Sequence, residues 1–596
     1  MAKHPSIQEI DLVQVDILVD GSPIDDTYAV TKVVIKQEVN KISSAVFEVL
    51  DGNPADQDFA ISASGDFLPG KEVTIKVGYQ TNSDDLFKGI ILSHRIKSSG
   101  GEHSCLIVKC FDKALKMTTT RKSAYYVNSK DGDVLSQLIG NHGVDADVGT
   151  TNHQHKEIIQ YQVTDWDFLM ARAQINGMIA LAMDGKVTVK APEVTGAPKV
   201  ELLYGVDIHE LDLDMNAQHQ LKQVECKAWD PGTHKIVSGA SAEPSNAAVG
   251  NVNGKKLSDV LGGDDFIIQS SGQIDEGMLK AWASGRLVSS RLSRITGTVS
   301  CQGHKDLVPN TTITLQGLGD RFNGDAYVSG VKHEVQDGNW LTVVKIGLDA
   351  NWFTEKQQDI MLPPASGSLP GIEGMHIGIV KQIQDDPDGE FRVQVDIPTI
   401  EESGEGVWAR MVQLYASNEY GTFFWPEVGD EVLLSFLNGD PRFPVIVGKM
   451  YSKKNPAPYT PDEPNTIKAI VTKSLMKLEF EDEKKIITLD TPGGNMLIID
   501  DDAQSITLED QHGNKIVMES AGITLDSPKD INIKSKANIN LEATQNITIK
   551  ATGDATVEGM NVTNKASIAF KAEGSATAEL KASGQTTVKG AIVMIN

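Results

Sequence analysis

The sequence predicts a mainly β protein made of an α+β amino-terminal module, a small β-barrel and a shaft of short stacked strands. Three observations support this class. Apolar and polar residues alternate along most of the chain, which is the period of a half-buried strand. Two proline-rich stretches divide the 596 residues into modules of different character. Near its carboxyl end, the chain repeats one apolar-x-apolar pattern every eight residues.

The eight-residue repeat runs through residues 530–553, DINIKSKANINLEATQNITIKATG. Each block opens with Asp or Asn and places two apolar residues two positions apart, so both side chains face one side of a strand. A block is therefore a strand of about three residues followed by a polar turn. Strands of that size are marginal in water, so the blocks must stack on further copies. The predicted shaft core consists of Ile531, Ile533, Ile539, Leu541, Ile547, Ile549 and Val557.

The period of the repeat leaves two kinds of shaft open. Three octads could form one coil of a single-chain β-helix, or three chains could each supply one face of a shared shaft. A meander at the edge of a globular domain is a third interpretation. It is disfavoured because meanders do not keep one strict period over four units.

The composition argues against several classes of protein. The chain has 81 acidic and 55 basic residues, a formal net charge of −26, and no block of basic residues. Nucleic acid and anionic membranes are therefore unfavourable partners, since both attract positive charge. Four cysteines in so long a chain do not make a disulfide framework. The amino terminus lacks an apolar signal core, and no segment is long enough to cross a bilayer, so we expect synthesis in the bacterial cytoplasm without a signal peptide.

Linkers rich in Pro, Gly and Ser, at 361–374 and 452–466, separate three expected domains. These are an α+β region at 1–360, a barrel at 372–451 and a shaft at 467–596. The shaft begins with longer alternating strands, predicted at 475–482, 484–491, 495–502 and 505–520, before the octads.

The first domain contains predicted strands at 73–79 and 87–99 and three helices. The helix at 131–143 ends in Gly, whereas Thr164 and Asp275 are suitable N-caps for the other two. An apolar stripe on the second helix is interpreted as helix core rather than as a cofactor site. This stripe consists of Trp166, Leu169, Met170 and Ala173. We find no catalytic signature in this domain.

The second domain is predicted to contain five strands joined by Gly- and Asp-rich turns, which suggests a barrel of the oligonucleotide/oligosaccharide-binding (OB) type. Such barrels often bind single strands through basic grooves and stacking aromatic residues. Here the aromatic residues are Tyr420, Phe423, Phe424 and Trp425. Their charged neighbours are acidic, and acidic groups repel phosphate. We therefore interpret these rings as packing, either in the barrel core or between subunits.

Residues 406–451, GVWARMVQLYASNEYGTFFWPEVGDEVLLSFLNGDPRFPVIVGKMY, resemble the barrel of VgrG-type spike proteins of contractile injection systems. That family shows W-R-V, then Y-G, P-x-V-G-D-E-V, F-x-x-G-D-P-x-x-P and V-G. Upstream, residues 86–118 and 161–189 are similar to the late-control tail proteins of contractile phages. Hub, barrel and shaft follow one another in the family's order, so the resemblance covers nearly the whole chain.

The resemblance implies a homotrimer with an intertwined three-chain β-helix as its shaft and two barrel-like subdomains in each hub. Three hubs would present a pseudo-sixfold ring to a hexameric inner tube protein. The other implied partners are baseplate proteins, a PAAR-repeat tip protein, effector cargo and, transiently, the target membrane. The spike would be part of an injection particle and be secreted or released on firing. Both a type VI apparatus and an extracellular injection particle stay open as the parent machine.

We expect a protein that is not an enzyme and holds no cofactor or metal. Phage relatives can carry a lysozyme domain between barrel and shaft, but only the 452–466 linker lies there. No effector domain is expected after Asn596. His153 and His155 have ligand-like spacing without a nearby partner cluster.

Two other functions stay open at this point, a glycan-binding or glycan-degrading β-helix and a passive fibre or adhesin. The first requires paired carboxylates or an aromatic sugar-stacking face. The adjacent carboxylates Asp500, Asp501 and Asp502 lie in a predicted turn and are interpreted as solvated.

The last residues of the chain are apolar, whereas a solvated tail is usually polar. Three copies of Ile592, Val593, Met594 and Ile595 would form a blunt apolar platform. Exposed apolar patches often mark binding surfaces. In VgrG-like spikes the matching end carries a PAAR-repeat tip, so we expect this platform to bind such a tip. The alternative is that these residues only close the shaft core.

Overall fold

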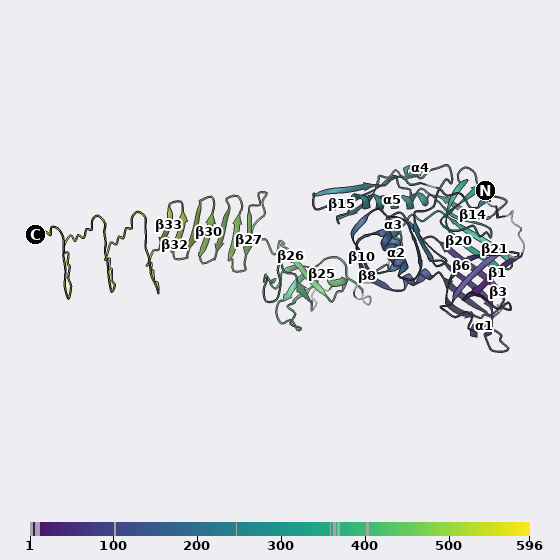
Figure 1. Cartoon of the computed structure of the whole chain (residues 1–596), viewed down its shortest axis with the longest axis horizontal. Helices are drawn as coiled ribbons and strands as arrows, with labels where there is room; N and C mark the ends of the chain where they lie inside the picture. Colours follow the sequence, from purple (N-terminus) through teal and green to yellow (C-terminus); the bar gives the residue numbers. More distant parts are fainter. Residues whose placement is uncertain are drawn as a thin grey trace. The chain divides into compact units, whose positions relative to one another are not determined.

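The computed structural model describes residues 4–5, 12–80, 82–100, 103–245, 247–357, 359–361, 365, 370–400 and 405–595. Much of the expected 361–374 linker, most of the first eleven residues and Asn596 lie outside this range. The chain divides into two compact units, Met1–Tyr451 and Ser452–Asn596. Strands dominate both units, which confirms the mainly β class (Figure 1).

The largest element of the first unit is a 13-stranded sheet. Its main path runs β14-β18-β21-β20-β3-β4-β7-β6-β5-β1-β2, and β19 pairs with β20 and β13 beside it. The strands are β1 (Val13–Val19), β2 (Ser22–Pro23), β3 (Val30–Glu38), β4 (Ser44–Leu50), β5 (Glu72–Tyr79), β6 (Asn82–Lys97), β7 (Cys105–Phe111), β13 (Glu201–Leu203), β14 (Ile208–Met215), β18 (Ile295–Gln302), β19 (Thr311–Gln316), β20 (Gly324–Gln336) and β21 (Asn339–Ile346). Strands β5 and β6 confirm the two strands predicted in this region.

Two hydrophobic cores lie along this sheet. The first surrounds Phe47 and is formed mainly by β1 and β3–β7. The second surrounds Val299 and is formed largely by β18–β21. Antiparallel pairing of β20 with β3, in which Val335 lies opposite Val33, connects the two parts. Strands from the two ends of the hub sequence thus become neighbours in one sheet.

A smaller α+β body shares a third core. Its elements are β8 (Arg121–Lys130), α2 (Asp131–Gly140), β9 (Asp145–Val148), β10 (Gln154–Thr164), α3 (Asp165–Ile175), β11 (Ile179–Met183) and β12 (Lys186–Lys190). The predicted cap of α3 is confirmed, because the Thr164 side chain accepts a hydrogen bond from the Asp167 N–H at 3.1 Å. The predicted apolar stripe of α3 is buried in this core.

The third predicted helix is α5 (Glu276–Leu292), and Asp275 caps it by accepting a hydrogen bond from the Met278 N–H at 3.0 Å. It packs on a three-stranded sheet of β15 (Val224–Asp230), β16 (Lys235–Ala240) and β17 (Phe266–Ser270). The short helical elements are α1 (Ala60–Ala63), α4 (Gly254–Ser258), α6 (Phe353–Lys356) and the 3-10 turns η2 (Lys113–Thr118), η3 (Asp259–Leu261) and η5 (Leu437–Gly439). No helix in the described part of the chain has the length and hydropathy of a membrane span.

The five predicted barrel strands close into a barrel of order β22-β23-β24-β26-β25. They are β22 (His376–Gln382), β23 (Val393–Asp396), β24 (Val407–Met411), β25 (Glu431–Phe436) and β26 (Pro444–Lys449). Aliphatic side chains from every strand fill the interior, among them Val380, Val395, Ala409, Val432 and Ile446.

The aromatic residues of the barrel are not all core residues. Trp425 packs against the barrel core, but Tyr420, Phe423 and Phe424 are 60%, 80% and 53% exposed. The interpretation of these three rings as barrel core is therefore wrong, because they lie in the long β24–β25 connection outside the closed strands. Their interpretation as a contact between subunits stays a prediction.

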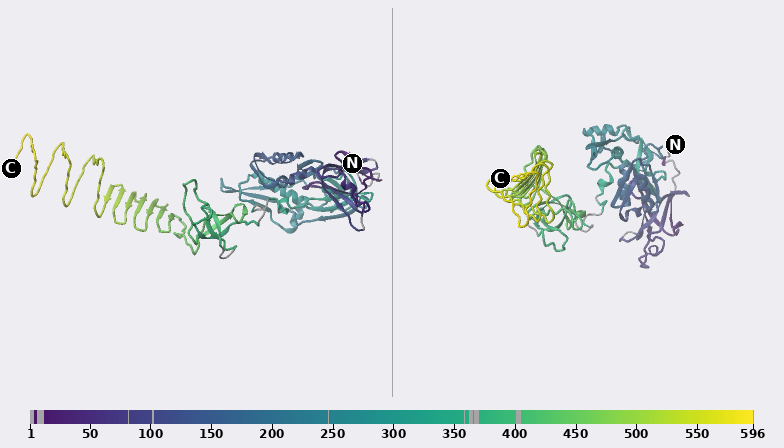
Figure 2. Two further views of the ribbon diagram at one scale, coloured as in Figure 1. Left: turned by 90° about the horizontal axis from the view of Figure 1, so that it is seen from below. Right: turned by 60° about the vertical axis from the view of Figure 1, so that its left-hand side comes forward.

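The second unit begins with a seven-stranded antiparallel sheet in sequence order. Its strands are β27 (Ile467–Val471), β28 (Lys477–Glu481), β29 (Ile486–Asp490), β30 (Met496–Asp500), β31 (Ser505–Glu509), β32 (Lys515–Glu519) and β33 (Gly522–Asp526). Strands β28–β30 confirm three of the predicted alternating strands, whereas the fourth, predicted as one strand at 505–520, is a hairpin of β31 and β32 joined by a turn at Asp510–Asn514. Beyond β33 the chain continues in wider excursions that lie apart from one another (Figures 1 and 2).

Candidate trimerisation surface

One side of the β27–β33 sheet carries two continuous columns of large apolar residues, and we call this side the apolar face. Cross-strand pairing aligns them in two columns, since paired residues and residues two apart in a strand share a face. The first column is Ile470, Leu478, Leu489, Leu497, Leu508, Ile516 and Leu525. The second is Phe480, Ile487, Ile499, Ile506, Met518 and Ile523, with Lys468 at its start.

The apolar face is largely uncovered within one chain. Ten of the thirteen large apolar side chains in the two columns are between 37% (Ile487 and Ile499) and 72% (Ile523) exposed, whereas Leu478, Leu497 and Ile516 are half-buried. A single sheet layer normally buries such a face against a second layer. The alternation of the sequence thus produces a surface that requires a partner.

The opposite face of the sheet is mixed, with apolar residues such as Ile486, Ile498 and Val517 among polar ones. Thr488, Thr507 and Thr524 alternate with the leucine and isoleucine columns along their strands. Ion pairs join neighbouring strand ends, as in Lys515 Nζ to Glu509 Oε2 at 3.0 Å. The Tyr459 hydroxyl donates a hydrogen bond to Glu479 on this face, which raises the pKa of Tyr459 to about 12. This face therefore carries polar and charged groups that can stay in water, and it lacks the continuous columns of the apolar face.

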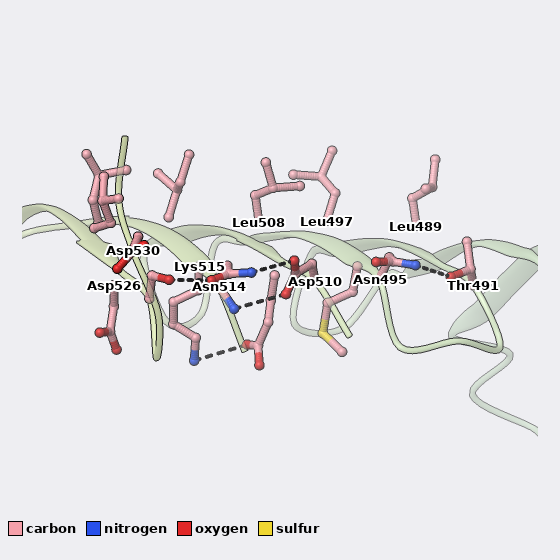
Figure 3. Close-up of a pocket in the computed structure, with 16 residues that line it drawn as sticks. Leu489, Thr491, Asn495, Leu497, Leu508, Asp510, Asn514, Lys515, Asp526 and Asp530 are labelled. Carbon is pink, nitrogen blue, oxygen red and sulfur yellow. Dashed lines mark hydrogen bonds and ion pairs between the residues drawn. The ribbon is translucent and has the colours of Figure 1, made fainter. Parts of the chain in front are cut away.

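A groove of about 570 Å³ runs along one edge of the sheet. Figure 3 shows Leu489, Leu497 and Leu508 standing in a row on one side of the strands, with polar turn residues along the edge. Asn514 Nδ2 donates to Asp510 Oδ2 at 2.7 Å and lowers the pKa of that carboxyl. The apolar wall of the groove is part of the first column.

The hairpin turns on this edge repeat every nineteen residues, a period that the sequence analysis missed. Thr472, Thr491 and Asp510 open equivalent turns in which the first residue's N–H donates to the carbonyl four residues on, at 3.0 Å in all three. Two of the turns contain Gly with positive φ, and the recurrence of Gly-Asn at 494–495 and 513–514 was the signal that could have shown them. Strands β27 and β33 were missed as well.

The octads form no β-ladder within the chain. In the described residues 527–595 no strand is assigned, and the last pairing is β32 with β33. The seven predicted shaft-core residues are between 51% and 80% exposed. A single chain therefore does not wind its octads into a β-helix of its own. The inward assignment of these residues stays a prediction about the assembly.

The predicted platform residues are also exposed, from 49% at Val593 to 91% at Ile595. Their arrangement around a common axis depends on further chains. The platform stays a prediction.

The histidine pair of the hub lies in an ion-pair network. His155 Nε2 lies 3.0 Å from Asp131 Oδ2, and Arg172 Nε lies 2.6 Å from Asp131 Oδ1. Burial acts to raise the pKa of Asp131, but hydrogen bonds from His155 and Arg172 hold it below its usual range. His153 Nε2 pairs with Asp275 Oδ2 at 2.9 Å. Within the described residues, no group of three or more His, Cys, Asp or Glu side chains could hold a metal ion.

Three family models match the chain in order. Residues 9–337, more than half of the chain, match the Alg8 N-terminal domain. The chain belongs to this family. Residues 376–451 match the type VI secretion system/phage-baseplate injector OB domain, and residues 486–551 match the phage baseplate V C-terminal trimerisation domain. The chain is thus a VgrG-type spike or phage-baseplate protein with an Alg8-type hub, an OB barrel and a trimerisation domain, and that last domain supports a homotrimer.

Curated relatives share shorter segments with this Alg8-family chain. The type VI secretion system spike protein VgrG3 of Vibrio cholerae is 33% identical over 126 residues, which cover 19% of this chain and 12% of that protein. The spike protein VgrG1c of Pseudomonas aeruginosa is 31% identical over 104 residues, 16% of this chain and 14% of that protein. The chain therefore spans a small part of these relatives' length.

Solved structures show partial similarity. A tail protein from Neisseria meningitidis superposes with a TM-score of 0.42 at 15% identity, covering 57% of this chain and 98% of that one. The Francisella PdpA–VgrG complex gives a TM-score of 0.37 at 9% identity, covering 87% and 80%.

Proposed function

We propose that three copies of this chain form the non-enzymatic central spike of a contractile injection baseplate. The observation that supports this proposal most directly is the half-exposed apolar face of β27–β33, which is followed by octads that find no strand partner in their own chain. The match of residues 486–551 to a trimerisation domain supports the same assembly.

Assembly into a trimer would supply what the second unit lacks in a single chain, a cover for its apolar face and strand partners for its octads. Three apolar faces cover one another, and three sets of octads supply the missing backbone partners. Burying an aliphatic side chain contributes roughly 1.5 to 3 kcal/mol, so the shaft gains tens of kcal/mol before chain entropy is subtracted. A shaft of this kind resists bending, because its hydrogen-bonded ladder and dry core run along the direction of force.

In this proposal the hub contacts a hexameric inner tube and baseplate proteins. The platform of Ile592, Val593, Met594 and Ile595 binds a PAAR-repeat tip. Effector cargo travels with the tip or spike, and contact with the target membrane is transient. The spike is made in the cytoplasm and leaves it as part of the injection particle. The names of the relatives support a secretion-system role of this kind.

Native mass spectrometry of the full chain tests the assembly. We expect one species at three times the chain mass of 64.4 kDa at micromolar concentration. A monomer under these conditions would contradict the proposal and would leave the apolar face unexplained. Co-purification with tube and tip proteins from a cell that expresses the whole particle tests the spike role, and a trimer that never associates with particles would favour a free fibre.

A further inference from the structure

The sheet and the octads of the second unit differ in how far a single chain satisfies their backbone hydrogen bonds. Residues 467–526 form a finished hydrogen-bonded sheet that lacks only a cover for its apolar face. The described residues 527–595 lack backbone partners as well. Pro528 lies two residues after the end of β33 and has no N–H to donate to a ladder, which favours the end of in-chain pairing there.

The octads contain little information about alignment between chains. The blocks that begin at Asp530, Asn538 and Asn546 share the same apolar spacing and similar aliphatic residues. A chain shifted by eight residues would therefore present nearly the same side chains to its neighbours. Register is weakly specified where shifted pairings bury similar residues.

The sheet, in contrast, contains features that distinguish one alignment of the chains from another. Its hairpins recur every nineteen residues, and the second apolar column includes Phe480 and Met518 among isoleucines. Lys468 stands at the start of that column, with its Nζ 2.5 Å from Asp482 Oδ2. A shift by one hairpin would bring the Lys468 ammonium to the level of Ile487. Burying this charged group among the isoleucines is unfavourable, because the Lys468–Asp482 pair would have to be desolvated.

We propose that the apolar face of β27–β33 is a register-setting surface, whose partner is the same face of two further copies, and that it aligns the chains before the octads wind together. A preformed sheet can associate without first being ordered, whereas the octads must be ordered in three chains at once. The trimerisation-domain match begins inside this sheet and extends into the octads. The inference rests on the proposed homotrimer.

Two full-length variants separate the roles of sheet and octads. Leu508→Asp places a charge on the apolar face, and we expect at least a tenfold loss of trimer by native mass spectrometry at low micromolar concentration. Ile547→Asp damages the octads, and we expect the native trimer to persist. Thr507→Asp, on the opposite, mixed face of the same strand, is the control and stays trimeric. A trimeric Leu508→Asp protein or a monomeric Ile547→Asp protein would overturn the inference, whereas a monomeric wild type would overturn the proposed homotrimer instead.

Mixed trimers report the register directly. A chain lacking one octad, residues 538–545, is co-expressed with the full chain, and single cysteines are introduced before the deletion. Residues at equal height around a three-fold axis can form disulfides, and the four native cysteines are buried. If the sheet sets the register, Ile533→Cys in both chains cross-links them.

A second pair of cysteines tests the alternative, in which the octads set the register and not the sheet. If alignment is set from the distal octads, the shortened chain slips by eight residues, and its Ile533→Cys cross-links to Leu541→Cys of the full chain. We expect the first cross-link and not the second, identified by peptide mass. The second cross-link alone would overturn the proposal, as would a failure of the two chains to mix, because their sheets are identical.

Discussion

Leu497 on β30 lies directly opposite Leu508 on β31, and both side chains stand on the same uncovered face of the sheet (Figure 3). This pair is the middle of a column that crosses all seven strands. Within one chain the column borders an open groove.

Truncation of Leu508 distinguishes a covered face from a solvated one. If the face is buried between chains, Leu508→Ala leaves a cavity, and we expect a loss of about 2 kcal/mol or more per chain in trimer stability. Thr507→Ala on the opposite, mixed face is the matched control, expected within about 0.5 kcal/mol. Urea dissociation followed by size measurement checks both. Equal effects of the two changes would show that the face stays solvated.

Ile539→Asp probes the octads. Three carboxylates around the shaft axis would be desolvated or forced to take up protons. We expect the trimer to lose its resistance to heat and SDS while the hub and barrel still fold. Asn540→Asp, one residue along the same strand, is the control and should keep that resistance. Unchanged resistance of the Ile539→Asp trimer would contradict the inward assignment of Ile539.

Deletion of residues 591–596 tests the platform. We expect the trimer to remain intact, since the sheet and octads are untouched, while co-purification with the PAAR-repeat tip is abolished and delivery is reduced. Pull-down of the tip with the shortened spike is the measurement. Full occupancy of the tip on the shortened spike would mean that these residues only close the core.

His333 makes the stability of the hub depend on pH. It is buried, its Nδ1 lies 2.8 Å from Thr342 Oγ1, and burial lowers its pKa to about 4. Because the unfolded state takes up a proton near pH 6.5 and the folded state does not, stability falls as the pH drops from about 6.5 toward 4. We expect a loss on the order of 2 kcal/mol between pH 7 and pH 5. Melting curves check it, and His333→Gln should reduce the slope.

Leu475 occupies a left-handed position that glycine fills in the equivalent turns. Its φ is 63°, whereas Gly494 and Gly513 have φ of 94° and 83°. Leu475 is exposed, so Leu475→Gly loses little burial and relieves strain, and we expect a gain of up to about 1 kcal/mol. The reciprocal Gly494→Leu should destabilise by a similar amount. Thermal unfolding of the shaft measures both, and destabilisation by Leu475→Gly would contradict the strain.

The sequence predicted the features that depend on local order. The N-caps at Thr164 and Asp275 and the five barrel strands are local, because a cap acts within one turn and a strand alternates with period two. β27 and β33 were missed although they are as long as the strands between them; they lie at the two ends of the sheet, beside the 452–466 linker and Pro528. The exposure of Tyr420, Phe423 and Phe424 was missed because burial depends on whether a loop folds over the barrel.

By itself the sequence determined the mainly β class, the order of hub, barrel and shaft, and the eight-residue period, all of which follow from side-chain alternation. Only the tertiary structure decided that β3 pairs with β20, that all seven leucines and isoleucines of the first column align with one another across β27–β33, and that the octads find no partner in their own chain. Period fixes which residues share a face of a strand. Which strands lie beside each other, and what covers that face, is set by contacts between residues distant in the chain or in another chain.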